Sequence, residues 1–185
     1  MQERQALQTR AAHGDVVAFE ALMRDTKAGL YRFVRRYVGD ADETYDLVQE
    51  AYAAAWLAIR RYEPERSFEA WLRTIAINKC RDWSRRRNIR RLFTGGADLQ
   101  STEALAVADD EVGPEDHYEA AEQAQRLHAA IAALPPKLKE PLLLTAIEER
   151  SHAEAAEILG LSVKAVEMRV ARARQKLSQQ LRVET

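Results

Sequence analysis

The sequence predicts an all-α protein made of two small helical domains joined by a flexible acidic linker. Apolar residues recur at three- and four-residue spacings, and no run alternates long enough to indicate a sheet. Residues 95–125 contain nine acidic and no basic residues, between two strongly basic segments. We therefore assign residues 1–94 to one domain, 95–115 to the linker and 116–185 to a second domain that contains a helix-turn-helix.

Composition narrows the classes of function. The 185 residues carry a net charge of −1, include a single cysteine, Cys80, and contain four histidines that are scattered along the chain. Neither a disulfide nor a metal site is predicted, and no cofactor is implied. The N-terminus lacks the apolar run of a signal peptide, and no stretch of 18 apolar residues occurs. We expect a soluble, cytoplasmic protein that does not insert into a membrane.

Two helices are predicted before the first basic segment. The first begins after the N-cap Asp15 and ends near Gly39, and its basic residues, Arg35 among them, are expected to be solvated. The second spans residues 42–61 and gathers three polar residues opposite an Ala-rich apolar arc. Acids there also complement the helix dipole, so this face is either a docking site or ordinary surface. Its residues are Asp46, Gln49 and Glu50, with Tyr52 and Trp56 expected to expose aromatic area nearby.

The helix over residues 67–91 combines an apolar core face with a cationic face. From Arg73 to Arg91 there are eight basic residues and one acid, Asp82, which gives a local charge of +7. A solvated helix end would explain part of this run, but the whole pattern suits a polyanion. Residues spaced four, three and four apart share one face. They are Thr74, Asn78, Arg81 and Arg85.

The second domain is predicted to begin with a helix that ends at Pro135-Pro136, followed by a helix over residues 137–148 that tolerates Pro141 in its first turn. A capping box then opens a short helix at Ser151, Gly160 ends it, and Ser162 caps another helix. This is the sequence pattern of a helix-turn-helix, although a plain helical hairpin has the same pattern. Outward positions on the last helix give a net charge of +5 over residues 164–182.

Taken together, these motifs resemble the extracytoplasmic function (ECF) group of bacterial sigma factors. The matching segments are DLVQEAY at 46–52, FEAWLRTIAIN followed by the arginine run, LP before a helix, and EAAEILGLSVKAVEMRVARARQKL at the C-terminal end. The resemblance covers residues 16–91 and 118–181. It implies a two-domain subunit that directs core RNA polymerase to promoter DNA, with an anti-sigma factor as a further partner.

The resemblance also implies roles for individual residues. Asp46, Gln49 and Glu50 would dock on core polymerase. The 62–67 loop and Asn78 would read the minus-10 element and capture a flipped base, in agreement with the stripe Thr74, Asn78, Arg81 and Arg85. The last helix would read the minus-35 element, where Glu167 departs from the cation often found in relatives and is limited to accepting from a cytosine amino group. The minus-35 set is Lys164, Glu167, Met168, Arg169, Ala171 and Arg172.

Two other functions compete with the sigma factor. A free-standing helix-turn-helix regulator would use residues 16–91 for dimerisation or sensing, yet the sequence offers no ligand pocket or metal set. An enzyme would need clustered carboxylates or an activated nucleophile on a fixed scaffold, and the acids Asp109, Asp110 and Glu111 lie in the predicted linker. We therefore expect a sigma factor without catalytic activity of its own. The acidic linker is further expected to fold back on the basic domains and restrain non-specific DNA binding.

Overall fold

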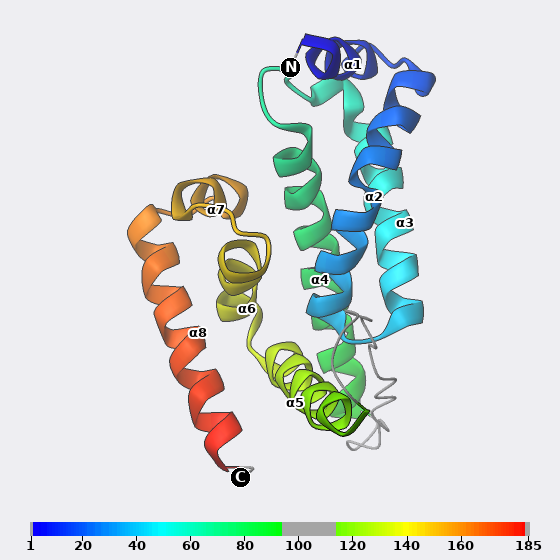
Figure 1. The fold of residues 1–185 in the computed structure, drawn as a ribbon. Helices are drawn as coiled ribbons and strands as arrows, with labels where there is room; N and C mark the ends of the chain where they lie inside the picture. The colour runs from blue at the N-terminus through cyan, green and yellow to red at the C-terminus, as the bar shows by residue number, and fades with distance from the viewer. Residues whose placement is uncertain (1, 94–113, 184–185) are drawn as a thin grey trace.

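The protein is described here by a computed structural model over residues 2–93 and 114–183. Within these two ranges every element is a helix, so the predicted all-α class is confirmed. Helices α1 to α4 form one bundle, and α5 to α8 form a second group beside it (Figure 1). The acidic segment 95–113, including the predicted fold-back of the linker, lies outside the described residues.

The N-terminal bundle is built by the helices whose ends the sequence marks. Asp15 accepts a hydrogen bond from the backbone N–H of Ala18 at 3.1 Å, which begins α2, and Gly39 ends it in the left-handed conformation, φ +85°. Asp40 then caps the next helix through the N–H of Glu43 at 2.9 Å. The elements are α1 (Gln2–Ala12), α2 (Val16–Val38), α3 (Ala41–Ala58), η1 (Ile59–Arg61) and α4 (Phe68–Phe93).

Two expectations about exposed side chains in this bundle are wrong. Arg35 is buried, whereas the sequence predicted that it lies on the solvated face of α2. Tyr52 is also buried, because its hydroxyl lies 3.0 Å from Thr26 Oγ1 and donates to the carbonyl of Met23 at 3.2 Å. Trp56 is partly exposed and packs on Phe19, with ring centroids 5.1 Å apart. A tyrosine at the edge of an apolar arc can therefore be core when a neighbouring helix supplies polar partners.

Helix α1 was not predicted, because its few apolar residues form no regular stripe. It lies across one end of the bundle and contributes the fully buried Ala11 to the core (Figure 1). Its polar side chains fix it to the start of α4 and to the loop before α4: Arg4 pairs with Glu69 at 2.7 Å, and Gln5 donates to the carbonyl of Pro64 at 2.7 Å. Tertiary contacts, rather than amphipathic pattern, hold this helix in place.

The C-terminal group contains the predicted helices with one interruption. Pro141 lies inside α6, and after Leu142 the helix predicted over 137–148 gives way to a π-helical turn. In that turn the N–H of Glu148 donates to the carbonyl of Leu143 at 3.0 Å, five residues earlier. The elements are α5 (Pro114–Ala133), α6 (Pro136–Leu142), η2 (Leu143–Ile147), α7 (His152–Leu159) and α8 (Val163–Val183).

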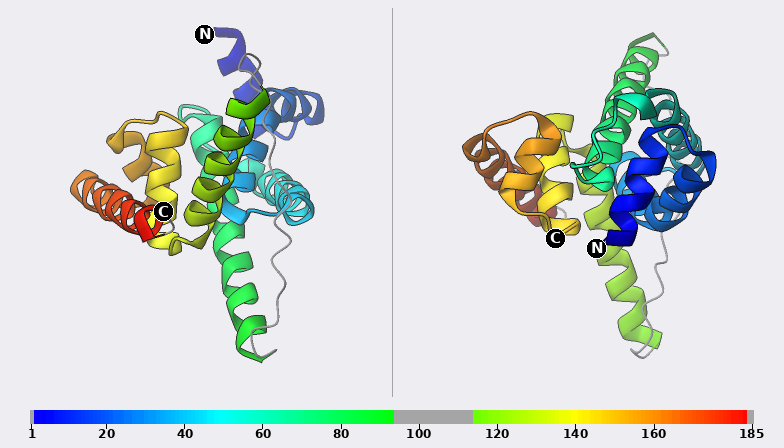
Figure 2. Two further views of the ribbon diagram at one scale, coloured as in Figure 1. Left: turned by 60° about the horizontal axis from the view of Figure 1, so that its bottom comes forward. Right: turned by 90° about the horizontal axis from the view of Figure 1, so that it is seen from above.

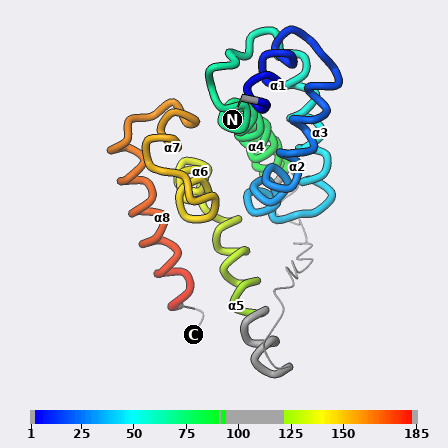
Figure 3. The backbone as a smooth tube through the Cα atoms, turned by 45° about the horizontal axis from the view of Figure 1, so that its top comes forward, coloured from blue at the N-terminus to red at the C-terminus, as the bar shows by residue number. Residues whose placement is uncertain are grey.

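The two groups pack directly against each other. Helix α5 runs from the lower end of the molecule to the base of α6 (Figure 3) and contacts α2. A Cβ built at Gly39 would lie 3.4 Å from the Cβ of Ala132, so this glycine allows α5 a close approach. Seen from above, α4 stands between the rest of its bundle and the C-terminal group (Figure 2). The contacts of α4 with α6 and α7 therefore decide which part of its surface is free.

Candidate nucleic-acid and polymerase interfaces

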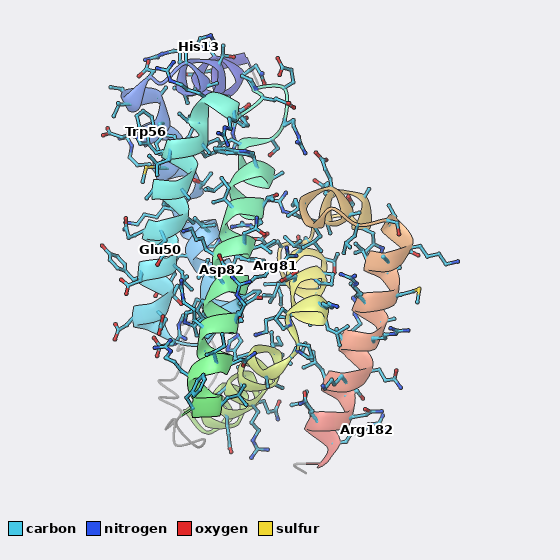
Figure 4. The ribbon with its side chains drawn as sticks, turned by 180° about the vertical axis from the view of Figure 1, so that it is seen from behind. His13, Glu50, Trp56, Arg81, Asp82 and Arg182 are labelled. Atoms are coloured by element: carbon cyan, nitrogen blue, oxygen red, sulfur yellow. The ribbon has the colours of Figure 1, made fainter. Side chains whose placement is uncertain are left out.

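The cationic stripe of α4 faces the C-terminal group. Its Arg81 side chain is directed toward α6 (Figure 4), where its Nε donates to Glu140 Oε1 at 2.8 Å. Thr74 Oγ1 donates to the carbonyl of Ile158 in α7 at 3.2 Å. Asn78 accepts a hydrogen bond from Arg81 at 3.2 Å, and Arg85 pairs with Asp82 on its own helix. The four residues do share one face, but acidic and backbone groups of the same chain occupy part of it.

The ion pair between Arg81 and Glu140 is formed by two charged groups in unequal surroundings. Glu140 is only 2 % exposed, whereas the Arg81 side chain remains 43 % exposed. The hydrogen-bonded carboxylate raises the pKa of Arg81, so the guanidinium stays protonated. The positive charge of Arg81 in turn offsets the desolvation of the buried Glu140 carboxylate. Arg81 is thus held in one orientation by a residue 59 positions away.

Three charged residues for which the sequence predicted no role complete this junction. Arg73, 6 % exposed, donates to Glu148 Oε2 through its Nε at 2.9 Å and lies over the Phe33 ring. Lys139, 3 % exposed, donates to the carbonyl of Tyr37 at 2.9 Å. The sequence does not distinguish these residues, because a charged residue buried between two domains and one on the surface have the same local sequence pattern. Their role becomes apparent only when the structure shows which groups of the other domain they contact.

Lys139 sits where two helices end. Its ammonium also donates to the carbonyl of Ala132, at 2.5 Å, and lies 4.7 Å from the centroid of the Tyr37 ring. A cation at helix C-termini complements their dipoles and satisfies carbonyls that have no partner within the helix. Burial lowers the pKa of Lys139 to about 8, so it is still mostly charged at neutral pH. This one side chain therefore joins the end of α2 to the end of α5.

The 62–67 loop that leads into α4 is fixed by aromatic packing. The Tyr62 ring lies 4.9 Å from the Trp71 ring and 5.6 Å from the Phe68 ring, and its hydroxyl donates to the carbonyl of Arg66 at 2.6 Å. Arg66 in turn pairs with Glu157 of α7 at 2.8 Å. The loop thus presents exposed Glu63, Glu65 and Ser67 on a rigid base.

The predicted docking residues lie on a different side of the molecule. Asp46, Gln49 and Glu50 are exposed on α3, and Glu50 is on the side of the bundle away from α6 to α8 (Figure 4). Glu50 pairs with Lys79 of α4 at 3.3 Å. Beside Gln49 a hollow of about 490 Å³ opens between α2 and α3, with aromatic and aliphatic walls and basic residues at its margin. Its lining is Arg24, Lys27, Ala28, Tyr31, Arg32, Tyr45, Val48 and Gln49.

The predicted helix-turn-helix is confirmed in its local geometry. Ser151 and Glu154 form a reciprocal capping box, and Gly160 closes α7 in the left-handed conformation, φ +64°. Ser162 Oγ accepts from the N–H of Ala165 at 3.2 Å and starts α8. The corner is packed by a small apolar set from both helices. This set comprises Ala156, Ile158, Val166 and Val170, which are buried, and Leu161, which is partly buried.

The outward face of α8 is open to solvent. The predicted minus-35 positions Lys164, Glu167, Met168, Ala171 and Arg172 are exposed, and Arg169 is partly exposed. Glu167 lies 3.9 Å from His152 Nδ1 on α7. None of these six residues lies on the buried side of the helix, where Val166, Val170 and Ala173 pack. An exposed helix face with three basic residues and one acid suits the major groove of DNA, as the sequence predicted.

The described part of the chain shows neither a metal-ligand cluster nor a membrane-spanning helix. Residues 2–93 and 114–183 contain no group of three or more His, Cys, Asp or Glu side chains placed to hold a metal ion. Over the same ranges, no helix is long and apolar enough to cross a membrane.

Comparison with known proteins identifies the family. The model of sigma-70 region 2 matches residues 22–90, and that of sigma-70 region 4 matches residues 124–177. The RNA polymerase sigma factor CnrH of Cupriavidus metallidurans is 40% identical over 93% of this chain and 91% of its own length. The chain belongs to the sigma-70 family. Within it, this sigma factor falls in the ECF group, as does SigW of Bacillus subtilis, 32% identical over 91% of both chains.

Solved structures agree with this assignment. CnrH in complex with the cytosolic domain of CnrY matches with a TM-score of 0.70 at 32% identity, covering 98% of this sigma factor and 99% of that chain. The sigma factor RpoE bound to the anti-sigma factor NepR from Bartonella quintana also gives a TM-score of 0.70, at 25% identity over 92% of this chain and all of that one. These relatives and structures show that the chain is a sigma factor rather than a free-standing regulator. Sigma factors bind core RNA polymerase and promoter DNA to initiate transcription.

Proposed function

We propose that this ECF sigma factor divides its work among three surfaces. The exposed α3 residues dock on core polymerase, the cationic stripe of α4 with the 62–67 loop binds the opened minus-10 element, and the outward face of α8 reads the minus-35 element. One observation carries this proposal: the same chain contains two basic helices, α4 and α8. Helix α8 is the second helix of a well-capped helix-turn-helix, and its outward face is open to solvent. No catalytic residue is assigned, and the protein acts in the cytoplasm.

The assignment of the minus-10 element rests on the character of the loop and the stripe. Taking a base out of the stack costs a few kcal/mol, which contacts in a pocket must offset. A loop held rigid by Tyr62 and Trp71 is suited to hold such a base, and Asn78 on the helix that follows offers both donors and an acceptor. Arginines along α4 then supply charge for the phosphates.

A regulatory partner is part of the proposal. Both solved structures described above are complexes, one of them with a protein named as an anti-sigma factor. By analogy we propose that an anti-sigma factor holds this protein inactive until a stress or envelope signal releases it. The basic hollow between α2 and α3 and the arginine-rich face of α4 favour a partner with acidic segments.

The test of the function is transcription in vitro. The purified protein would be combined with sigma-free bacterial core polymerase and fragmented genomic DNA of the source organism, and transcript 5′ ends would be sequenced. We expect recurring start sites that share two upstream elements. Absence of new starts with a demonstrably active core enzyme, despite DNA binding, would contradict the proposal.

The substitution Arg172→Ala should weaken binding to duplex DNA carrying the minus-35 element. Loss of one phosphate contact reduces the slope of log K against log salt by about 0.9. Arg182→Ala serves as a control because Arg182 is also an exposed arginine of α8 but lies at its far end (Figure 4). Titrations at several salt concentrations measure both variants, and an unchanged slope for Arg172→Ala would remove this residue from the DNA surface.

The substitution Asn78→Ala should impair promoter opening more than duplex binding. Asn78 is exposed and accepts a hydrogen bond from Arg81 of its own helix, so the fold should be retained. We expect permanganate reactivity of minus-10 thymines in the polymerase complex to fall about tenfold or more, an effect of about 1.4 kcal/mol. A promoter pre-opened by mismatches at minus-10 should restore part of the loss. Equal losses in opening and in duplex binding would make Asn78 a structural residue instead.

A further inference from the structure

Helix α1 lies beside the loop to which the proposed function assigns the flipped base. The 62–67 loop passes close to the N-terminal end of α1 on its way into α4 (Figure 1). Helix α1 also precedes the segment that the region 2 model matches, which begins at residue 22. We propose that α1 is a positioning element for minus-10 recognition, because it holds this loop in place for the base. The inference rests on the proposed function for the role of the loop, whereas the contacts themselves stand on the geometry.

Two consecutive side chains of α1 make these contacts. Arg4 Nη2 donates to Glu69 Oε1 at 2.7 Å, and Glu69 belongs to the first turn of α4. Gln5 Nε2 donates to the carbonyl oxygen of Pro64, inside the loop, also at 2.7 Å. The two contacts lie on either side of residues 65–68 in the chain. Helix α1 therefore holds both the loop and the start of the helix that follows it.

The middle of the loop needs such a support because the aromatic cluster secures mainly its ends. Tyr62 and Phe68 are buried, whereas the residues between them are exposed or partly exposed. A surface segment of this kind opens at low free energy unless other groups hold its backbone. The Tyr62 hydroxyl holds the carbonyl of Arg66 from within the loop, at 2.6 Å. Gln5 holds the carbonyl of Pro64 from outside it, and this proline has no N–H group through which it could be held instead.

Helix α1 is itself firmly seated, so it can serve as a support. Ala11 and Gln8 are buried in the N-terminal bundle, and Leu7 packs against the core. Gly14 then reverses the chain with φ +90°, a conformation that favours glycine, and its N–H donates to the carbonyl of Ala11 at 2.8 Å. The C-terminal half of α1 is thus anchored in the bundle, while its first turns reach the loop.

The charges of α1 favour a positioning role over direct contact with DNA. Residues 2–12 contain two arginines and one glutamate. Arg4 pairs with Glu69, and Arg10 pairs with Asp15 at 2.6 Å. Both cations of this helix are therefore neutralised within the chain, and its surface offers little attraction for a phosphate. Removal of Arg4 should consequently affect the loop without changing the number of phosphate contacts.

The strength of the two contacts sets the size of the expected effect. The Arg4 and Glu69 side chains are 49 % and 39 % exposed, and an exposed ion pair contributes little free energy. The bond from Gln5 joins two neutral groups and is also modest. A loop that is ordered before it binds nevertheless avoids part of the ordering cost of binding. Loss of both contacts should therefore weaken base capture several-fold without abolishing it.

The test compares two double variants of the full chain in holoenzyme with core polymerase. Arg4→Ala with Gln5→Ala removes both contacts to the loop and α4. Thr9→Ala with Arg10→Ala is the control, because it removes one arginine and one neutral polar residue from the same helix. The Thr9 hydroxyl donates to the carbonyl of Gln5 at 3.0 Å, and Arg10 pairs with Asp15, so neither touches the loop. All four residues are exposed, and urea unfolding should show both variants folded.

The motion of the loop and the opening of the promoter are measured separately. A nitroxide at Glu65→Cys reports loop mobility, and it labels this site selectively because Cys80 is completely buried. We expect the label to become more mobile in Arg4→Ala with Gln5→Ala. Permanganate reactivity of minus-10 thymines should fall about fivefold. In the control, both signals should stay within about twofold of the wild type. Core-polymerase affinity and the salt slope of duplex binding should not change in either variant.

The outcomes distinguish failure of this inference from failure of the proposed function. Unchanged opening in Arg4→Ala with Gln5→Ala, where Asn78→Ala does impair opening, would overturn the positioning role alone. Equal losses in both double variants would also overturn it, because general loosening of α1 would explain them. A smaller salt slope would mean that α1 contacts phosphate itself. If Asn78→Ala has no effect either, the minus-10 assignment fails and the inference fails with it, while transcription in vitro still tests the sigma factor function.

Discussion

The substitution Asp46→Arg should abolish the association of this sigma factor with core RNA polymerase. Asp46 is exposed on α3 beside Gln49 and Glu50, so a cation there reverses the charge of the face without disturbing the core. Juxtaposed like charges in an interface cost several kcal/mol, which corresponds to a loss of affinity of about 100-fold or more. Binding of labelled protein to core polymerase measures the effect, and promoter-dependent transcription should disappear with it.

A matched control separates docking from general electrostatics. Glu3→Arg makes the same charge reversal on the exposed surface of α1, and it should leave polymerase binding within about twofold of the wild type. Circular dichroism should show unchanged helix content for both variants. If Asp46→Arg binds core polymerase normally, the docking surface lies elsewhere, and the hollow between α2 and α3 becomes the next region to test.

The substitution Phe68→Ala should be the most destabilising change at the start of α4. Phe68 is completely buried, and its ring lies 6.0 Å from Phe19, 5.6 Å from Tyr62 and 5.7 Å from Trp71. Truncation of a buried phenylalanine lowers the free energy of unfolding by about 3–5 kcal/mol. The same rings support the 62–67 loop, so minus-10 recognition should weaken even where the protein is folded.

Tryptophan fluorescence is well placed to measure this loss. All three tryptophans, Trp56, Trp71 and Trp83, belong to α3 and α4, so urea unfolding followed by their emission reports on the N-terminal bundle. Leu57→Ala is the control because Leu57 is 86 % exposed on α3, and its loss should change stability by less than about 0.5 kcal/mol. A shift for Phe68→Ala no larger than the control would show that the aromatic cluster does not stabilise the bundle.

The C-terminal half illustrates how much a sequence can specify locally. The capping box at Ser151, the left-handed Gly160 and the cap at Ser162 each depend on residues within four positions of one another. These caps can therefore be predicted from the sequence without knowledge of the fold, and the predicted turn matches the observed one. The π-helical turn over Leu143–Ile147, in contrast, was not predicted, since the sequence indicated one continuous helix over residues 137–148.

Side chains at junctions were harder to predict for a physical reason. Tyr52 and Arg35 lie at the margins of apolar stripes, where periodicity alone does not decide between core and surface. Helix α1 shows the opposite case, since it has almost no stripe and is held by contacts to residues about sixty positions away. In each instance the deciding partner is remote in sequence.

The sequence by itself determined the helical class, the caps, the helix-turn-helix and the family, because these depend on spacing and short-range chemistry. It also placed Thr74, Asn78, Arg81 and Arg85 on one face, which the helix of α4 preserves. Only the tertiary structure determined which groups of the chain contact that face, namely residues of α6 and α7. Buried charges such as Glu140 and Lys139 stabilise nothing until their partners are near, since Coulomb attraction and desolvation both depend on distances that the chain order does not contain.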